Sequence, residues 1–243
     1  MRTTKIEWTE RTWNPVTGCT KRSKGCEHCY AETMARRLLA MGNYKYRYGF
    51  KNTMHPEAIE EPLKWRKASL VFVCSMGDLF HEDVPFMFID KVMDIIRRTP
   101  QHTYQLLTKR AERMAEYFET TTIPQNVWLG VTVEDVSTKF RIDYLRPISA
   151  AVKFLSCEPL LCDLGSLELC SIDWIIVGGE SGPIARPMKE EWVLNIKRQA
   201  EENEIPFFFK QWGTWSKDGI RGNKKKNGKL LQGKVIQQMP KVK

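Results

Sequence analysis

Residues 173–179 read Asp-Trp-Ile-Ile-Val-Gly-Gly, an apolar stretch rich in β-branched side chains that ends at two glycines. Such near-continuous apolar character is typical of a strand that is covered on both faces of a parallel sheet. Five further stretches of the same kind occur along the chain, at residues 70–75, 103–108, 126–133, 151–157 and 205–212. Successive stretches begin 22 to 33 residues apart. Each interval therefore has room for a crossover helix between two parallel strands.

The segments between these stretches have the spacing of helices. Residues 84–100 end at a proline and repeat apolar side chains on one helical face, at Phe88, Val92, Ile95 and Ile96. Residues 109–121 and 189–203 have the same mixture of apolar and charged positions, and a shorter strand candidate lies at residues 5–9. Alternating strands and helices predict an α/β fold with a parallel sheet, either a barrel or an open doubly wound sheet. We expect a partial TIM-like barrel of six βα units.

The C-terminal end has a different composition. From Gly213 onward the alternation breaks into a segment rich in Gly and Lys. We therefore expect residues 1–212 to form the βα barrel and residues 213–243 to form a basic extension with one hairpin. The net charge of +9 allows a polyanionic partner, because Lys and Arg neutralise phosphates. A basic tail that is merely solvated remains the alternative interpretation.

Composition also bears on location. Hydrophobic residues make up 42% of the 243-residue chain, which suffices for a substantial core. No apolar run approaches the roughly 18–20 residues that span a bilayer. The first residues, Met-Arg-Thr-Thr-Lys, are not followed by the apolar segment of a signal peptide. We expect a cytoplasmic protein without a membrane segment, a compartment in which disulfides seldom persist.

The seven cysteines fall into two groups. Four are scattered, and two of these, Cys74 and Cys157, lie in apolar runs where a thiol behaves as a small buried hydrophobe. The others are Cys19, Cys26 and Cys29, which form a Cys-x6-Cys-x2-Cys motif directly before a helix-like stretch. In a reducing compartment such close spacing indicates metal or redox chemistry.

Thiolates are the preferred ligands of zinc and of iron–sulfur clusters. A closed structural zinc site needs four ligands, whereas three cysteines on a [4Fe–4S] cluster leave one iron open. His28 is a candidate fourth zinc ligand, but three ligands among four consecutive residues crowd one ion. The motif favours a cluster held by Cys19, Cys26 and Cys29. A zinc- or cluster-containing nucleic-acid-binding protein without catalysis is the alternative.

Polar and charged residues follow nearly every predicted strand. In βα folds the carboxyl ends of the strands form the active site. Capping of the following helix or a tight turn is the simpler explanation for any single residue. Charges of both signs at several ends favour an anionic or zwitterionic ligand, and the residues concerned include Asp78, Lys109, Glu134, Glu158, Glu180 and Lys210.

The cysteine motif resembles that of a known superfamily. The run Asn14-Pro15…Gly18-Cys19…Gly25-Cys26-Glu27-His28-Cys29-Tyr30-Ala31 is similar to the cluster loop of radical S-adenosylmethionine enzymes, in the spore-photoproduct-lyase-like branch. It resembles still more a group of phage-borne and bacterial three-Cys-motif proteins, and this resemblance extends over most of the chain. The superfamily usually has Cys-x3-Cys-x2-Cys, so this chain has three extra residues. Doubling a flexible loop costs only about 0.6 kcal/mol, so the longer loop can still close.

The resemblance implies a [4Fe–4S] cluster, S-adenosyl-L-methionine, a 5′-deoxyadenosyl radical and a flavodoxin- or ferredoxin-like reductant. It assigns the methionyl amine to the segment after the second strand, which is Ser75, Met76, Gly77 and Asp78. It assigns the ribose contacts to Thr132 and Glu134. It assigns the adenine contacts to Gly178 and Gly179, and Glu180 belongs to the same cofactor site. Lys109, Glu158 and Lys210 remain as catalytic residues for the substrate.

Residues 44–51, Tyr-Lys-Tyr-Arg-Tyr-Gly-Phe-Lys, interleave aromatic rings with cations. This composition is typical of a surface that stacks bases and follows phosphates. Rings that pack on the edge of the barrel are the alternative. We expect a nucleic acid or a nucleotide as substrate, with a peptide or a small metabolite as the rival.

Overall fold

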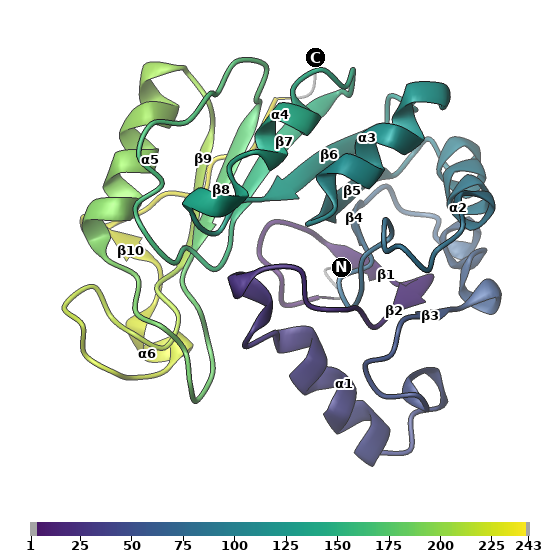
Figure 1. The fold of residues 1–243 in the computed structure, drawn as a ribbon, viewed down its shortest axis with the longest axis horizontal. Helices are drawn as coiled ribbons and strands as arrows, with labels where there is room; N and C mark the ends of the chain where they lie inside the picture. Colours follow the sequence, from purple (N-terminus) through teal and green to yellow (C-terminus); the bar gives the residue numbers. More distant parts are fainter. Residues whose placement is uncertain (1–3, 242–243) are drawn as a thin grey trace. The chain divides into compact units, whose positions relative to one another are not determined.

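The computed structural model describes residues 4–241, and strands and helices alternate as the sequence predicts, except that no helix lies between residues 158 and 173 (Figure 1). The strands are β1 (Arg11–Trp13), β2 (Val16–Thr17), β3 (Thr53–Met54), β4 (Leu70–Val73), β5 (Thr103–Thr108), β6 (Val127–Thr132), β7 (Val152–Cys157), β8 (Trp174–Gly178), β9 (Phe207–Gln211), β10 (Leu230–Leu231) and β11 (Lys234–Val235). The helices are α1 (Tyr30–Ala40), α2 (Phe86–Arg98), α3 (Ala111–Thr120), α4 (Arg141–Leu145), α5 (Glu190–Glu202) and α6 (Lys224–Asn227). Short 3-10 turns lie at Lys24–Cys26, Tyr44–Tyr46, Pro56–Ala58, Glu61–Lys64 and Val136–Thr138.

Within residues 4–241, seven strands form one sheet in the order β1-β4-β5-β6-β7-β8-β9. All six strands predicted from apolar runs are present as β4 to β9. The predicted α/β class with a parallel sheet of partial TIM-barrel type is confirmed. The chain divides into two compact units, one of Met1–Arg22, Cys29–Leu129 and Ile148–Ala151, the other of Ser23–His28, Gly130–Pro147 and Val152–Lys243.

The first unit is built on three parallel strands. β4 pairs with β1 on one side and with β5 on the other, so that Val71 lies opposite Arg11 and Tyr104. Helix α2 buries the apolar face that its spacing predicts, formed by Phe88, Ile89, Val92, Met93, Ile95 and Ile96. β2 and β3 form a separate antiparallel pair. The β-branched and aromatic residues of β4 and β5 therefore lie in a core on which the loops after these strands are mounted.

The strand predicted at residues 5–9 is wrong. The chain turns there, because the amide of Thr9 donates to the carbonyl of Ile6 at 3.4 Å and the Thr9 hydroxyl donates to Leu70 O at 3.1 Å. Trp8 packs its ring on Phe72 with 4.7 Å between ring centroids. The pairing with β4 begins only at Arg11, so β1 starts two residues after the turn.

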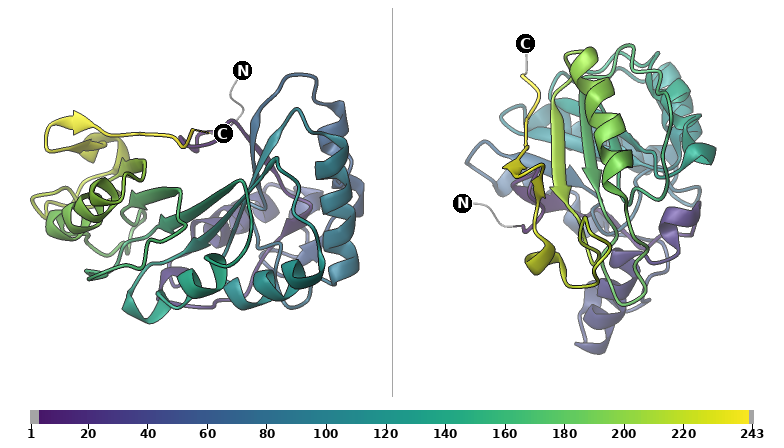
Figure 2. Two further views of the ribbon diagram at one scale, coloured as in Figure 1. Left: turned by 90° about the horizontal axis from the view of Figure 1, so that it is seen from above. Right: turned by 90° about the vertical axis from the view of Figure 1, so that its left-hand side faces the viewer.

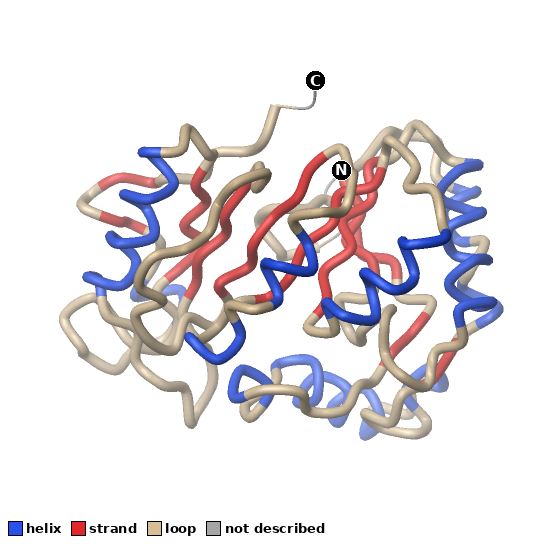
Figure 3. Tube along the Cα trace, turned by 45° about the horizontal axis from the view of Figure 1, so that its top comes forward, coloured by secondary structure: helices blue, strands red, loops and turns tan. Residues whose placement is uncertain are grey.

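The second unit repeats the parallel arrangement. β8 pairs with β7 and β9 in parallel, and helix α5 lies beside β9 (Figures 1 and 2). The strands contribute a fully buried aromatic core that includes Phe154, Trp174, Phe207 and Phe209. Figure 3 shows the strands of each unit in red and the helices in blue. The polar residues after β7, β8 and β9 are thereby held by a rigid scaffold.

The basic C-terminal segment contains the predicted hairpin, formed by β10 and β11. Beyond it the chain returns to the sheet: Phe209 N donates to Ile236 O at 2.7 Å, and Gln238 N donates to Phe207 O at 3.1 Å. The division of the protein at residue 212 remains a prediction. No helix within residues 4–241 is long and apolar enough to cross a membrane.

Candidate functional site

The cysteines differ in burial. Cys74 and Cys157 are buried as predicted, and burial raises the pKa of Cys74 to about 12 and also raises that of Cys157. These two thiols therefore stay protonated. Cys19, Cys26 and Cys29 are partly exposed. They are accessible to a ligand, as are Cys162 and Cys170 far along the chain.

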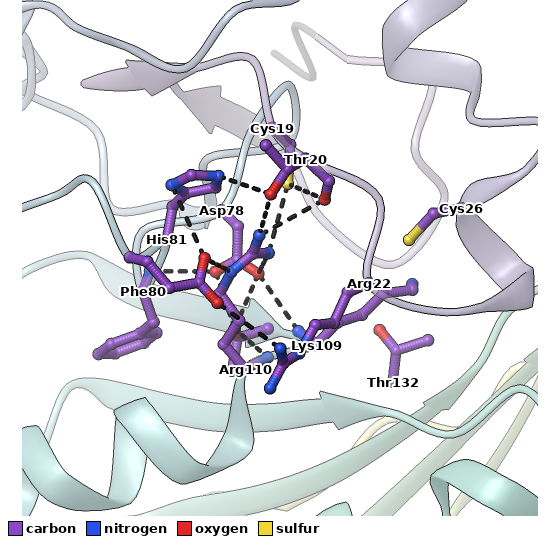
Figure 4. A network of polar contacts seen from close by, with 12 residues as sticks. Cys19, Thr20, Arg22, Cys26, Asp78, Phe80, His81, Lys109, Arg110 and Thr132 are labelled. Atoms are coloured by element: carbon purple, nitrogen blue, oxygen red, sulfur yellow. Dashed lines mark hydrogen bonds and ion pairs between the residues drawn. The ribbon is translucent and has the colours of Figure 1, made fainter.

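The backbone around Cys19 is held on both sides. Gly18 N donates to Met76 O at 2.8 Å, and Cys19 N donates to Phe50 O at 3.1 Å. The sulfur of Cys19 accepts a hydrogen bond from a guanidinium nitrogen of Arg110 at 3.4 Å (Figure 4). The first cysteine of the motif thus lies beside a permanent positive charge.

Arg110, the residue before helix α3, is the centre of a buried polar network (Figure 4). Its guanidinium also donates to Glu82 at 2.6 Å, to Asp78 at 3.2 Å and to the Thr20 hydroxyl at 2.9 Å. Burial alone would lower the pKa of Arg110, but the charges of Asp78, Cys19 and Glu82 outweigh it and raise that pKa. The cation is therefore fixed, and its side chain is only 2% exposed.

Asp78, which the resemblance assigns to the methionyl amine, is occupied by groups of its own chain. One carboxylate oxygen accepts from Phe80 N at 3.0 Å and from the Thr108 hydroxyl at 2.7 Å. The other accepts from Arg110 at 3.2 Å and from Lys109 N at 3.3 Å. This carboxylate joins the loop after β4 to the loop after β5.

The residues before Asp78 border the start of the cysteine motif. The amide oxygen of Asn14 accepts from Ser75 Oγ at 3.2 Å and from Met76 N at 3.0 Å. Gly77 forms a parallel bridge with Gly18. The structure therefore places Met76 and Gly77 beside Gly18, the residue before Cys19.

Cys26 belongs to a segment that is held by two carboxylates of the second unit. Its amide donates to Ser23 O at 2.9 Å, and the Ser23 hydroxyl donates to Glu134. Glu134 is fully buried and is paired with Arg141 at 2.8 Å, while Arg141 also donates to Thr132 O at 2.7 Å. Glu134 thus joins the end of β6 to the loop before Cys26.

Glu180 has the same relation to the other side of this segment. It accepts two hydrogen bonds from the guanidinium of Arg186, at 2.6 and 3.0 Å, and pairs with His28 Nδ1 at 3.1 Å. Arg186 also donates to Lys24 O at 3.0 Å and to Glu27 at 2.8 Å. Burial would raise the pKa of Glu180, but the hydrogen bonds from Arg186 and His28 lower it.

We call Glu134, Glu180 and Arg186 the loop clamp, because they hold residues 23–28. Ser23 and Lys24, which bind the clamp, lie in the six-residue spacer between Cys19 and Cys26. This spacer is three residues longer than in the usual superfamily motif. It supplies the Ser23 hydroxyl and the Lys24 carbonyl, which the loop clamp binds. Glu134 and Glu180, which the resemblance assigns to the cofactor site, are thus engaged with the cysteine motif.

The two predicted catalytic residues of the second unit meet. Lys210 Nζ lies 2.7 Å from a carboxylate oxygen of Glu158, and the side chains are 19% and 13% exposed. Gly178 lies beside this pair, because a Cβ there would approach the same oxygen of Glu158 to 2.8 Å. A Cβ at Gly179 would collide with the carbonyl of Trp212. Both glycines are thus closely packed within the chain.

Sequence reasoning missed Arg110 and Arg186. Arg110 carried a signal, since it directly follows Lys109 at the end of β5. The backbone amide of Lys109 donates to Asp78 at 3.3 Å. Arg186 lies in the loop between β8 and α5, where no pattern singled it out.

Among residues 4–241, no group of three or more His, Cys, Asp and Glu side chains is gathered closely enough to hold one metal ion. Thiolates on a cluster bind different irons and so are spaced more widely than the ligands of one ion. The ligand set Cys19, Cys26 and Cys29 remains a prediction.

Comparison with known proteins gives one family match and several structural ones. The model of the family described as "Protein of unknown function (DUF5131)" matches residues 3–240. No curated protein sequence matches the chain. A cysteine-to-serine mutant of spore photoproduct lyase matches with a TM-score of 0.46 and 11% identity over 74% of this chain and 60% of that chain.

Two further structures of that lyase match at 8% identity, over 83% of this chain and 65% of each of those chains. One, a double mutant with bound AdoMet and dinucleoside spore photoproduct, has a TM-score of 0.46. The other, complexed with dinucleoside spore photoproduct, has a TM-score of 0.45. The chain spans 60 to 65% of the length of these lyase chains.

Proposed function

The chain belongs to the DUF5131 family of proteins of unknown function, and we propose that it is an iron–sulfur enzyme of the radical S-adenosylmethionine type, acting on a nucleic acid or a nucleotide. One observation carries the proposal. Three partly exposed cysteines lie within the eleven residues 19–29, directly before α1, and the first of them accepts a hydrogen bond from the buried guanidinium of Arg110.

The donor set fits a [4Fe–4S] cluster. Cys19, Cys26 and Cys29 would hold three irons and leave the fourth open for an outside ligand. A thiolate-bound cluster is negatively charged, and hydrogen bonds to its sulfurs together with burial set its reduction potential. The cation of Arg110 beside Cys19 supports this assignment. When bound, such a cluster supplies the electron that cleaves the sulfonium of S-adenosylmethionine to methionine and a 5′-deoxyadenosyl radical, with a flavodoxin- or ferredoxin-like protein as reductant.

Other residues of the chain have proposed roles in binding S-adenosylmethionine and in positioning the cysteine loop. Ser75, Met76 and Gly77 border Cys19 and are proposed to bind the methionyl part of S-adenosylmethionine, and Thr132, Gly178 and Gly179 its adenosyl part. Asp78, Glu134 and Glu180 are proposed to serve the cofactor site as positioning residues. Their carboxylates are bound to Arg110, Arg141 and Arg186, and of these arginines Arg110 and Arg186 also contact the segments that carry Cys19 and Cys26.

Lys210 and Glu158 are proposed to contact the substrate, together with Lys109. The ion pair at 2.7 Å holds the Glu158 carboxylate, directly after β7, beside the Lys210 ammonium, which lies within β9, and both are partly shielded from water. Such a pair can accept a hydroxyl or an imide N–H of a nucleobase and donate to its carbonyl. The net charge of +9 supports a substrate that carries phosphate.

The metal content of anaerobically purified protein tests the proposal. We expect brown protein with about four irons per chain. Replacing Cys19, Cys26 or Cys29 by Ala abolishes iron binding, while Cys162→Ala and Cys170→Ala are matched controls that retain it. Full cluster content in the Cys26→Ala protein would refute the ligand set. Colourless protein with one zinc would support a nucleic-acid-binding protein without catalysis.

A second experiment tests the reaction. Iron-loaded protein is incubated anaerobically with S-adenosylmethionine and dithionite, and we expect 5′-deoxyadenosine and methionine in equal amounts. Protein that contains four irons but releases no 5′-deoxyadenosine would contradict the radical chemistry. The cluster would then have a structural role.

A further inference from the structure

Two tyrosines on the first unit expose large aromatic surfaces beside a cation. Tyr44 is 74% exposed and Tyr48 is 59% exposed. The guanidinium carbon of Arg47 lies 4.1 Å from the ring centroid of Tyr44 and 4.6 Å from that of Tyr48. Arg47 also donates to Tyr44 O at 3.1 Å, which fixes the guanidinium against its own turn. The two rings and the cation form a pre-arranged group, which we call the Tyr–Arg–Tyr surface.

The structure separates the aromatic residues of this segment into two roles. Tyr46 is only 7% exposed, and burial raises its pKa, so its ring belongs to the core. The short turn at Tyr44–Tyr46 begins at Asn43, whose side chain accepts from Lys45 N at 3.1 Å. The alternative interpretation, in which the rings of residues 44–51 pack on the protein, therefore holds for Tyr46. The rings of Tyr44 and Tyr48 are exposed and accessible to a ligand.

The surface is connected to Cys19. Two residues after Tyr48, the carbonyl of Phe50 accepts the amide of Cys19 at 3.1 Å. The next carbonyl, that of Lys51, lies so close to Gly18 that any Cβ there would collide with it, and Gly18 has a φ of +77°. The segment that carries the Tyr–Arg–Tyr surface is thus packed against the backbone of the first motif cysteine.

The charge around the surface favours an anion. Residues 30–51 carry five Lys and Arg side chains and one carboxylate. The carboxylate, Glu32, pairs with Arg36 at 2.6 Å, and Lys45 lies 3.9 Å from Glu61. Arg37, Arg47 and Lys51 add further positive charge, and all three belong to the exposed residues of this unit.

We infer that the Tyr–Arg–Tyr surface binds single-stranded nucleic acid and leads it to the site at Cys19. Exposed aromatic rings stack on bases, and cations between them follow the phosphates. A duplex hides its base faces in its own stack, so stacking of this kind selects unpaired bases. The inference rests on the proposed function for the reaction at Cys19, while the binding itself requires only residues of the surface.

Fluorescence anisotropy with a labelled oligothymidylate of about 16 nucleotides tests the inference, at about 50 and 200 mM salt. We expect the single strand to bind more tightly than the same sequence in a duplex. Tyr44→Ala and Tyr48→Ala should each weaken binding by about 5- to 150-fold, the effect of losing one stacked base. Arg47→Gln should lower the slope of log affinity against log salt by about one. Tyr144→Ala removes a tyrosine that is 40% exposed in α4 and is the matched control.

Three results would overturn the inference: wild-type affinity in the Tyr44→Ala/Tyr48→Ala double variant, equal affinity for duplex and single strand, and displacement of the oligonucleotide by poly-glutamate at equal charge concentration. The last result would indicate an acidic protein partner. Iron content measured on the same preparations separates the two proposals. Absent binding by protein with four irons contradicts only this inference, and strong single-strand binding by iron-free protein contradicts only the proposed function.

Discussion

Replacing Arg110 by Met tests the network that connects Asp78 to Cys19. Methionine keeps an unbranched apolar stem of similar reach and removes the guanidinium. The change deletes the hydrogen bonds to Glu82 at 2.6 Å, to Asp78 at 3.2 Å and to the Cys19 sulfur at 3.4 Å. Because the side chains of Arg110 and Asp78 are both buried, water cannot replace the donor that Asp78 loses.

The expected magnitude follows from what the two carboxylates lose. Removing one partner of a buried ion pair costs about 3–5 kcal/mol, since the other charge stays buried. Asp78 is 5% exposed but keeps the Thr108 hydroxyl and the amides of Phe80 and Lys109 as donors. The side chain of Glu82 is 51% exposed and regains water. We therefore expect the lower end, a loss of about 3 kcal/mol in the free energy of unfolding.

Urea unfolding of four proteins measures the effect: the wild type, Arg110→Met, Asp78→Asn and the double variant. The Asp78→Asn change removes the charge and keeps the shape. If the two side chains form one buried pair, the double variant loses less than the sum of the single changes, with a coupling of about 1–3 kcal/mol. Arg198→Met is the matched control, because its side chain is 61% exposed and its pair with Glu202 contributes at most about 1 kcal/mol.

A loss below about 1 kcal/mol in Arg110→Met would refute the reasoning. So would strict additivity of the two single changes, because residues without a shared charge do not couple. Either result would mean that Asp78 is held by its neutral donors alone.

Three further predictions concern the loop clamp, the buried histidines and the ion pair of Lys210 with Glu158. Arg186→Ala should speed hydrogen exchange of the backbone amides in residues 23–28, because Glu180 and the Lys24 carbonyl lose their donor. Mass spectrometry measures this exchange, and an unchanged rate would contradict the loop clamp. Lowering the pH from about 7 to 5 should reduce the free energy of unfolding, because burial lowers the pKa of three imidazoles and the unfolded chain then binds more protons. The three imidazoles are those of His55, His81 and His102. Each changes the free energy of unfolding by at most about 1.4 kcal/mol per pH unit. A urea midpoint that does not change with pH would exclude this linkage. Lys210→Met should lower the free energy of unfolding by about 1–3 kcal/mol, because Glu158 loses its partner at 2.7 Å. Adding Glu158→Gln should restore part of that loss in urea unfolding. No recovery in the double variant would contradict the pairing.

The sequence by itself determined the elements of the fold. Strands β4 to β9 are set by short apolar runs, and α2 by an apolar face with helical period. Both signals are local, because the conformation of a segment and the side it buries follow from residues a few positions apart. Cys74 and Cys157 lie in these apolar runs and are buried, as the sequence predicts. The three cysteines of the motif lie outside the runs and are partly exposed.

The tertiary structure alone decided which groups meet. Arg110 and Cys19 are 91 positions apart, and Glu180 and His28 are 152 positions apart. Such pairs depend on the order of strands in the sheet and on the path of each loop, and no local period encodes either. Glu134 and Glu180 are examples: in the folded chain their desolvated carboxylates take the nearest donors, which belong to the cysteine loop and to Arg141 and Arg186.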